Sequence, residues 1–174
     1  MSSFVCSTCH SVHTGLPMGY RVAFPLTDYS DREVTFEREG ELVKAGEDRL
    51  ILANIELPVK GSADQFVWTC WISLSHASYD RMQRLWDEPG RHAQESAFGY
   101  VSVSLPTYEP STFALKSRVH TRSIGIRPWV ELEPTSHPLA VEQREGIELE
   151  RIVAVYHHFA DGVHSGASLD KELS

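Results

Sequence analysis

The stretch ILANIELPVKGSADQFVWTCWISLS, residues 51–75, combines two alternating apolar patterns with a short polar link. An apolar residue at every second position puts one face of a β-strand against a core. The link KGSADQ, residues 60–65, has the small and polar composition of a turn. The residues expected to face inward are Ile51, Ala53, Ile55, Leu57 and Val59 before the link and Phe66, Trp68, Cys70, Ile72 and Leu74 after it. This stretch therefore predicts two antiparallel strands that are neighbours in a sheet.

Further strands are expected downstream of this pair, and irregular structure upstream of it. Residues 98–105, 113–120 and 126–132 carry short apolar patterns bounded by turn-forming residues, which is typical of strands. Residues 16–31 contain two prolines and a glycine, so we expect them to run as irregular chain over the domain.

Three helices are predicted from apolar residues at helical spacing and from their capping residues. Residues 75–87 begin with a serine, a residue type that caps helices. Residues 136–146 start with Ser136 as the expected cap and have Pro138 in the first turn. Residues 147–162 form the last helix. The residues expected to face the sheet are Tyr79, Met82, Leu85 and Trp86 in the first helix and Leu149, Ile152, Val153 and Tyr156 in the last.

These elements predict an α+β domain with a largely antiparallel sheet, one middle helix and two C-terminal helices. A chain of 174 residues is long enough to bury one core and short for two, so residues 1–165 are expected to form one domain. Its N-terminal segment, residues 4–13, resembles a zinc knuckle. Residues 166–174 are expected to be a loose tail.

Charge and hydropathy narrow the expected partners and location. A net charge of −8 repels phosphate backbones, so a nucleic-acid partner is not expected, whereas a protein partner is compatible with it. No apolar run approaches the roughly 18 residues that would span a bilayer, so no membrane interaction is expected. The first fifteen residues show no secretory pattern, so the protein is expected to be cytoplasmic. The oligomeric state stays open.

The N-terminal segment FVCSTCHSVH, residues 4–13, concentrates residues that bind metals. Cys6 and Cys9 form a C-x-x-C, a spacing at which two thiolates can bind one tetrahedral ion, and His13 can supply a third ligand. We expect zinc as the cofactor. A redox pair and a metal-free segment are the alternatives, and the redox reading is weakened because no helical pattern follows the pair.

A closed zinc site needs a fourth ligand from elsewhere in the chain. His137 is the candidate, because the start of a helix would hold it in a fixed position. The alternative role of His137 is to cap that helix. Cys70 is expected to be a core residue rather than a ligand, because it shares a strand face with Trp68 and Ile72.

Several enzyme classes have no support in this sequence. It contains no H-E-x-x-H, no G-x-S-x-G, no H-x-E with P-C-x-x-C and no glycine-rich phosphate loop. Metalloproteases, α/β-hydrolases, deaminases and nucleotide-binding proteins are therefore not expected.

Taken in order, five features resemble one bacterial family from about Phe4 to the final helix. They are the C-x-x-C with its following histidine, then IELPV, FVWTCWISLS, LPTYEPSTFALK and RPWVELEPTSHPLAVEQREGI. The family is domain-of-unknown-function family 2199. The resemblance implies Cys6, Cys9 and His13 as the metal knuckle and residues 127–143 as the most characteristic segment, and it implies no activity. This chain departs from the family pattern at His10, where the family tends to have glycine, and at residues 52–54, where an Arg-Gly is expected.

Three functional interpretations follow. The first is a non-catalytic binding or regulatory module that a zinc knuckle stabilises. The second is a zinc enzyme of unknown substrate, in which Cys6, Cys9 and His13 hold the ion and water completes the site. The third is a pocket lined by tryptophans, and Trp71 is then the residue expected to contact a ligand, provided that no helix covers its strand face.

Overall fold

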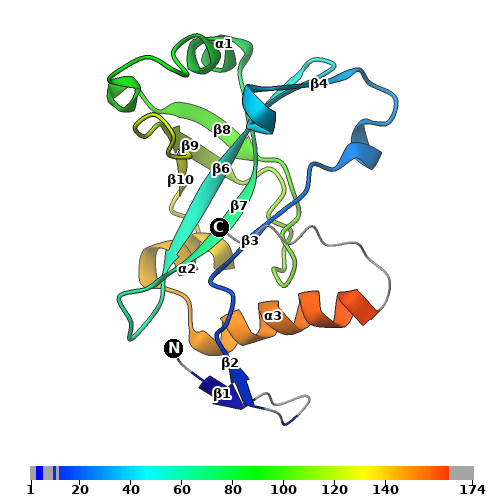
Figure 1. The fold of residues 1–174 in the computed structure, drawn as a ribbon, viewed down its shortest axis with the longest axis vertical. Helices are drawn as coiled ribbons and strands as arrows, with labels where there is room; N and C mark the ends of the chain where they lie inside the picture. The colour runs from blue at the N-terminus through cyan, green and yellow to red at the C-terminus, as the bar shows by residue number, and fades with distance from the viewer. Residues whose placement is uncertain (1–2, 6–9, 11, 165–174) are drawn as a thin grey trace.

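The computed structural model describes residues 3–5, 10 and 12–164. Its strands are β1 (Ser3–Val5), β2 (Val12–Thr14), β3 (Gly19–Arg21), β4 (Val34–Glu37), β5 (Leu42–Ala45), β6 (Asp48–Pro58), β7 (Gln65–Leu74), β8 (Ala97–Val101), β9 (Lys116–His120) and β10 (Trp129–Leu132). Its α-helices are α1 (His76–Arg84), α2 (Pro138–Glu145) and α3 (Leu149–His164). The predicted α+β class, the middle helix and the two C-terminal helices are confirmed (Figure 1).

The long hairpin β6–β7 is the centre of the fold, as the alternating patterns of residues 51–75 predict. Its two strands pair antiparallel, with Ile55 opposite Trp68 and Ala53 opposite Cys70. The side chains predicted to face inward are buried on both strands. Burial raises the pKa of the Cys70 thiol to about 12, which confirms this cysteine as a core residue.

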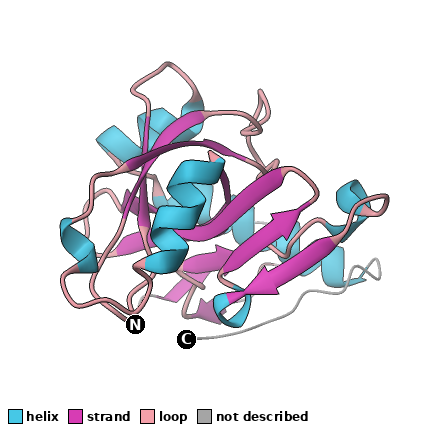
Figure 2. Cartoon of the chain, turned by 90° about the horizontal axis from the view of Figure 1, so that it is seen from above, coloured by secondary structure: helices cyan, strands magenta, loops and turns pink. Residues whose placement is uncertain are grey.

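Five strands close into a barrel, in the order β6, β7, β8, β9, β10 and back to β6. Each neighbouring pair is antiparallel except the last, since β10 lies parallel to β6 with Trp129 opposite Asn54. Figure 2, which looks down on the molecule from above, shows the strands curving around one another instead of forming a flat layer. The sheet is thus largely antiparallel, as predicted, and its closure is an additional finding.

Three strands that the sequence reading missed extend the barrel. β3 pairs parallel with β7, and β5 and β4 continue the sheet beyond β6. The residues around β3 do run over the outside of the barrel, as the irregular segment 16–31 was expected to do, but part of that segment is a strand.

The helices lie at opposite ends of the barrel, α1 at the top of Figure 1 and α2 and α3 at the bottom. The Ser75 hydroxyl accepts a hydrogen bond from the Ser78 N–H at 3.1 Å, which confirms the predicted cap of α1. In α2 the predicted cap is wrong, because His137 and not Ser136 is the N-cap residue. In α3 the buried side chains are Ile152 and Val155, so the predicted inward stripe is correct only in part.

The N-terminal strands form a small sheet of their own. β1 and β2 pair antiparallel, with Ser3 opposite Thr14. Cys6 and Cys9 of the predicted knuckle, and the predicted tail 166–174, lie outside the described residues. None of the helices in the described part of the chain has the length and apolar content that a bilayer crossing needs.

Candidate functional site

A cleft with a volume of about 680 Å³ opens on the surface of the described structure. Three segments that are distant in sequence line it: residues 38–41 between β4 and β5, residues 86–91 after α1, and residues 124–127 between β9 and β10. Ligand sites in proteins usually measure roughly 300–1,000 Å³. By size and position, this cleft is the candidate functional site.

One wall of the cleft is a left-handed turn of three consecutive residues. Arg38, Glu39 and Gly40 have φ values of 51°, 57° and 86°. Residues other than glycine rarely adopt this conformation, and each one that does costs about 1–2 kcal/mol. Glu41 N–H closes the turn on the Arg38 carbonyl at 3.1 Å. Backbone strain of this kind is concentrated at functional sites, and here it occurs at two consecutive non-glycine residues, Arg38 and Glu39, that both line the cleft.

Replacing Glu39 with glycine is expected to raise the free energy of unfolding by roughly 0.5–1 kcal/mol. Glycine has no Cβ to oppose a positive φ, and this gain exceeds the extra backbone entropy that glycine loses on folding. Chemical denaturation measures the change. Glu33→Gly is the matched control, because Glu33 is an exposed glutamate outside the turn without a positive φ. Equal destabilisation of both variants would show that the turn is unstrained.

Arg91 organises the opposite wall. Its side chain lies over the Trp86 ring at 4.8 Å, and the residue is only 5% exposed. Its guanidinium donates four hydrogen bonds to backbone carbonyls: Nε to Arg122 at 2.8 Å, Nη1 to Trp86 at 2.9 Å, and Nη2 to Ser123 at 3.1 Å and to Ile126 at 2.8 Å. Burial lowers the pKa of Arg91. One side chain thus fixes the loop between β9 and β10 in place.

Two bidentate ion pairs brace the same loop. Arg127 donates to both Glu41 oxygens at 2.7 and 2.6 Å, and these hydrogen bonds raise the pKa of Arg127. Arg122 donates to both Glu56 oxygens at 2.6 and 2.9 Å. Paired guanidinium and carboxylate forks combine energy with fixed geometry, so the cleft wall is held in one shape before any ligand binds.

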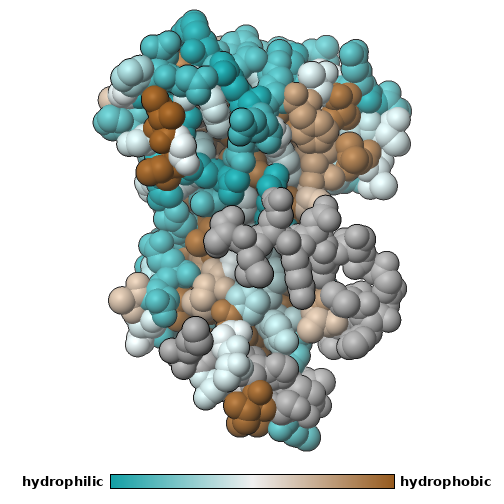
Figure 3. Space-filling view, viewed as in Figure 1, coloured by the Kyte–Doolittle hydropathy of each residue, from teal (hydrophilic) through white to brown (hydrophobic). Residues whose placement is uncertain are grey.

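The loop also presents apolar side chains to solvent. Ile124 and Ile126 are 50% and 51% exposed. Figure 3 shows brown residues on a mostly teal surface at the upper left, where Figure 1 places the loop between β9 and β10. The cleft therefore combines an apolar side with fixed charged groups.

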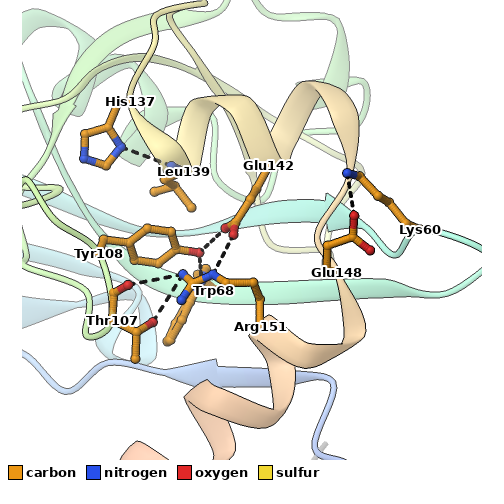
Figure 4. A network of polar contacts seen from close by, with 9 residues as sticks. All are labelled: Lys60, Trp68, Thr107, Tyr108, His137, Leu139, Glu142, Glu148 and Arg151. Atoms are coloured by element: carbon orange, nitrogen blue, oxygen red, sulfur yellow. Dashed lines mark hydrogen bonds and ion pairs between the residues drawn. The ribbon is translucent and has the colours of Figure 1, made fainter.

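A second polar cluster, drawn in Figure 4, lies at the other end of the barrel. The Tyr108 hydroxyl donates to Glu142 at 2.6 Å and accepts from Trp68 Nε1 at 3.2 Å. Arg151 donates to the other oxygen of Glu142 at 2.9 Å and lies over the Tyr108 ring at 5.1 Å. Burial, followed by the Glu142 charge, raises the pKa of Tyr108 well above its usual range. These groups satisfy one another, so we interpret the cluster as the fastening of α2 and α3 to the barrel.

The sequence allowed two roles for His137, metal ligation and helix capping, and in the structure His137 caps α2. Its Nδ1 accepts from the Leu139 N–H at 3.1 Å, and its Nε2 lies 2.8 Å from the Pro110 carbonyl (Figure 4 shows the first contact). Because a carbonyl only accepts, Nε2 carries the proton and the ring is a neutral tautomer with both nitrogens engaged. Metal ligation by His137 stays a prediction that would require at least one of these bonds to break.

The other predicted ligands are placed only in part. Cys6, Cys9 and the His13 side chain lie outside what the structure describes. His10, where the resembled family tends to have glycine, has a φ of 55°, the conformation that glycine favours. Within the described part of the chain, no group of three His, Cys, Asp or Glu side chains is arranged to hold a metal.

The sequence reading missed most of the cleft residues. Arg38, Asp87 and Arg91 lie in no recognised motif, and only Arg127 belongs to a segment that was singled out, residues 127–143. Glycines at 40 and 125 were the available signals, since both have a positive φ and mark tight turns.

Comparison with known proteins places the chain in a family without assigning an activity. No curated protein and no solved structure matches it. The family model of DUF2199, described as an uncharacterized protein conserved in bacteria, matches residues 5–147, which is well over half of the chain. The protein therefore belongs to this uncharacterised bacterial family.

Proposed function

We propose that this protein is a non-catalytic binding module whose cleft holds a segment of a protein partner. The observation that carries the proposal is the left-handed turn Arg38–Gly40, of which Arg38 and Glu39 line the cleft. Residues held in a sparsely populated backbone conformation are concentrated at ligand sites.

The lining of the cleft favours a polypeptide segment over a small molecule. Small-molecule sites are lined mainly by apolar side chains, whereas six of the ten residues that line this cleft are charged. Exposed Ile124 and Ile126 beside charged groups correspond to the apolar centre and polar rim of a protein interface.

The charged groups of the cleft favour binding over catalysis. Glu41 is held by both of its oxygens to Arg127, and Asp87 accepts from Arg38 at 2.7 Å. A general base must be able to take a proton from a substrate, and a carboxylate held in an ion pair is poorly suited to this. These contacts support the binding interpretation over the alternative of an enzyme.

Replacing Ile126 with aspartate is expected to weaken peptide binding by about tenfold or more. Random peptides displayed on phage and selected on the protein should share an apolar residue, because burial of one such side chain contributes about 1.5–3 kcal/mol. The dissociation constants of selected peptides for both proteins measure the effect.

Leu26→Asp is the matched control, since Leu26 is also an exposed aliphatic residue, at 57%, and lies outside the cleft. Selected peptides should bind this control as they bind the unaltered protein. Selection of no peptides, or of peptides that bind equally well to Ile126→Asp, would refute the proposed function.

We also propose that the N-terminal segment binds zinc through Cys6, Cys9 and His13, on the strength of their spacing. Elemental analysis of the purified protein is expected to find about one equivalent of zinc, and Cys6→Ser together with Cys9→Ser should abolish it. Cys70→Ser is the control, because Cys70 is fully buried in the core, and it should retain the metal. Protein purified without added chelator that contains no zinc would contradict the proposal.

A further inference from the structure

Arg38 is the guanidinium of the cleft that a carboxylate holds through a single contact, and it has donors to spare. A guanidinium has five N–H groups. In Arg38 one on Nη1 is bonded to Asp87 at 2.7 Å, and one on Nη2 is bonded to the Gln83 carbonyl at 2.8 Å. The others have no acceptor among the described residues. Glu41 holds Arg127 through both of its oxygens, whereas Asp87 holds Arg38 through one, so Arg38 is the guanidinium whose carboxylate is more easily replaced.

The carboxylate that Arg38 now holds is weakly bound. The Asp87 side chain is 70% exposed and contacts Arg38 through a single oxygen, Oδ2. An exposed single contact of this kind is worth little, because water competes for both groups. The Gln83 carbonyl would keep Arg38 aimed at the cleft if Asp87 moved away.

Arg91 adds positive charge behind this pair. Its hydrogen bonds all go to carbonyls, and no carboxylate in the described part of the chain lies within ion-pair distance of it. Buried cations in proteins are usually paired with an anion. The lining of the cleft carries the three guanidinium groups of Arg38, Arg91 and Arg127 and the three carboxylates of Glu39, Glu41 and Asp87, so the cleft is neutral overall in a chain of net charge −8.

We propose that the partner segment carries a carboxylate that replaces Asp87 on Arg38, next to an apolar side chain that packs on Ile126. Asp87 is then an internal stand-in that occupies the anion position until a ligand arrives. This inference rests on the proposed function, because it names the chemistry of the segment that the cleft holds. The carboxylate belongs either to an acidic side chain or to a chain terminus.

Small probes test the chemistry and distinguish the two sources. N-acetyl-leucine and its amide compare a terminal carboxylate with a neutral group, and N-acetyl-aspartyl-leucinamide and its asparaginyl analogue do so for a side chain. Titrations followed by amide chemical shifts should show each effective acid perturbing residues 86–91 and 124–127. The probe whose carboxylate has the same origin as that of the partner, a chain terminus or a side chain, is expected to bind about tenfold more tightly than its neutral analogue. This is the effect of one charge-assisted hydrogen bond.

Two variants test whether the preference for acids depends on Arg38 and Asp87. Arg38→Gln should abolish the preference for acid over neutral probe, and Asp87→Asn should tighten acid binding several-fold because the internal competitor is lost. Arg32→Gln and Asp48→Asn are the matched controls, since Arg32 and Asp48 form a similar partly exposed ion pair outside the cleft. Both controls should bind the probes as the unaltered protein does.

The proposal is overturned if no acid binds in the cleft, if acids and neutral analogues bind equally, or if Asp87→Asn leaves acid binding unchanged. Peptides that depend on Ile126 but show no dependence on a carboxylate would overturn this inference and leave the proposed function standing. Loss of both dependences would remove the proposed function as well.

Discussion

Replacing Arg91 with leucine is expected to lower the free energy of unfolding by roughly 3–5 kcal/mol, because several hydrogen bonds from one buried guanidinium are lost together. Four carbonyls lose a hydrogen-bond donor at once, those of Trp86, Arg122, Ser123 and Ile126, although the Ser123 carbonyl keeps the N–H of Ile126 at 3.0 Å. A buried polar group without a partner costs about 1–3 kcal/mol, although part of the loop can relax toward water. Chemical denaturation measures the loss of stability.

The same substitution should loosen the loop between β9 and β10. Hydrogen exchange at residues 121–127 is expected to accelerate more than exchange in the β6–β7 hairpin. Arg91→Lys separates charge from geometry, because lysine keeps the charge but cannot reproduce the guanidinium fork. It should therefore lower the free energy of unfolding by most of the amount expected for Arg91→Leu. Arg118→Leu, an exposed arginine on β9, is the control and should change stability by less than about 0.5 kcal/mol. Equal effects at 91 and 118 would show that the four carbonyl contacts contribute nothing.

Replacing Trp71 with alanine is expected to cost about 3–5 kcal/mol, the usual range for a buried tryptophan. Trp71 is 2% exposed, and its ring meets Phe24 edge to face at 5.3 Å. The interpretation of Trp71 as a ligand contact is therefore wrong. Phe24, in the segment that follows β3, packs on this face of β7.

Two further variants identify what Trp71 contributes. Its indole N–H is buried with no partner among the described residues, so Trp71→Phe loses no hydrogen bond and should cost clearly less than Trp71→Ala. Trp129→Ala is the matched control, because Trp129 is only partly buried and stacks on His120 at 4.3 Å. It should cost about 1 kcal/mol, the value of one aromatic pair. Thermal unfolding at the same temperature for Trp71→Ala and Trp129→Ala would show that the Phe24 contact is not part of the core.

Local patterns were sufficient for the central hairpin and the three helices, but not for β3, β4 and β5. The alternation in residues 51–75 predicts the β6–β7 hairpin and its buried face, because the period of two reports directly which side chains leave water. The caps of helices are equally local, and Ser75 was identified correctly. At α2 two polar residues stood in succession, and sequence alone did not decide between Ser136 and His137. In the structure His137 is the cap, and its ring also contacts the carbonyl of Pro110, which is distant in sequence.

The barrel and the cleft depend on contacts between segments that no local pattern connects. Closure rests on the parallel pairing of β10 with β6, between Trp129 and Asn54. The cleft wall rests on Arg91 binding carbonyls around residues 122–126, and a carbonyl is the same chemical group at every position of a chain. Sequence by itself thus determined the β6–β7 hairpin with its buried face and the three helices, since each is a property of neighbouring residues, whereas β3, β4 and β5 were missed. Only the tertiary structure decided which guanidinium meets which carbonyl, because those partners come together only when the barrel closes.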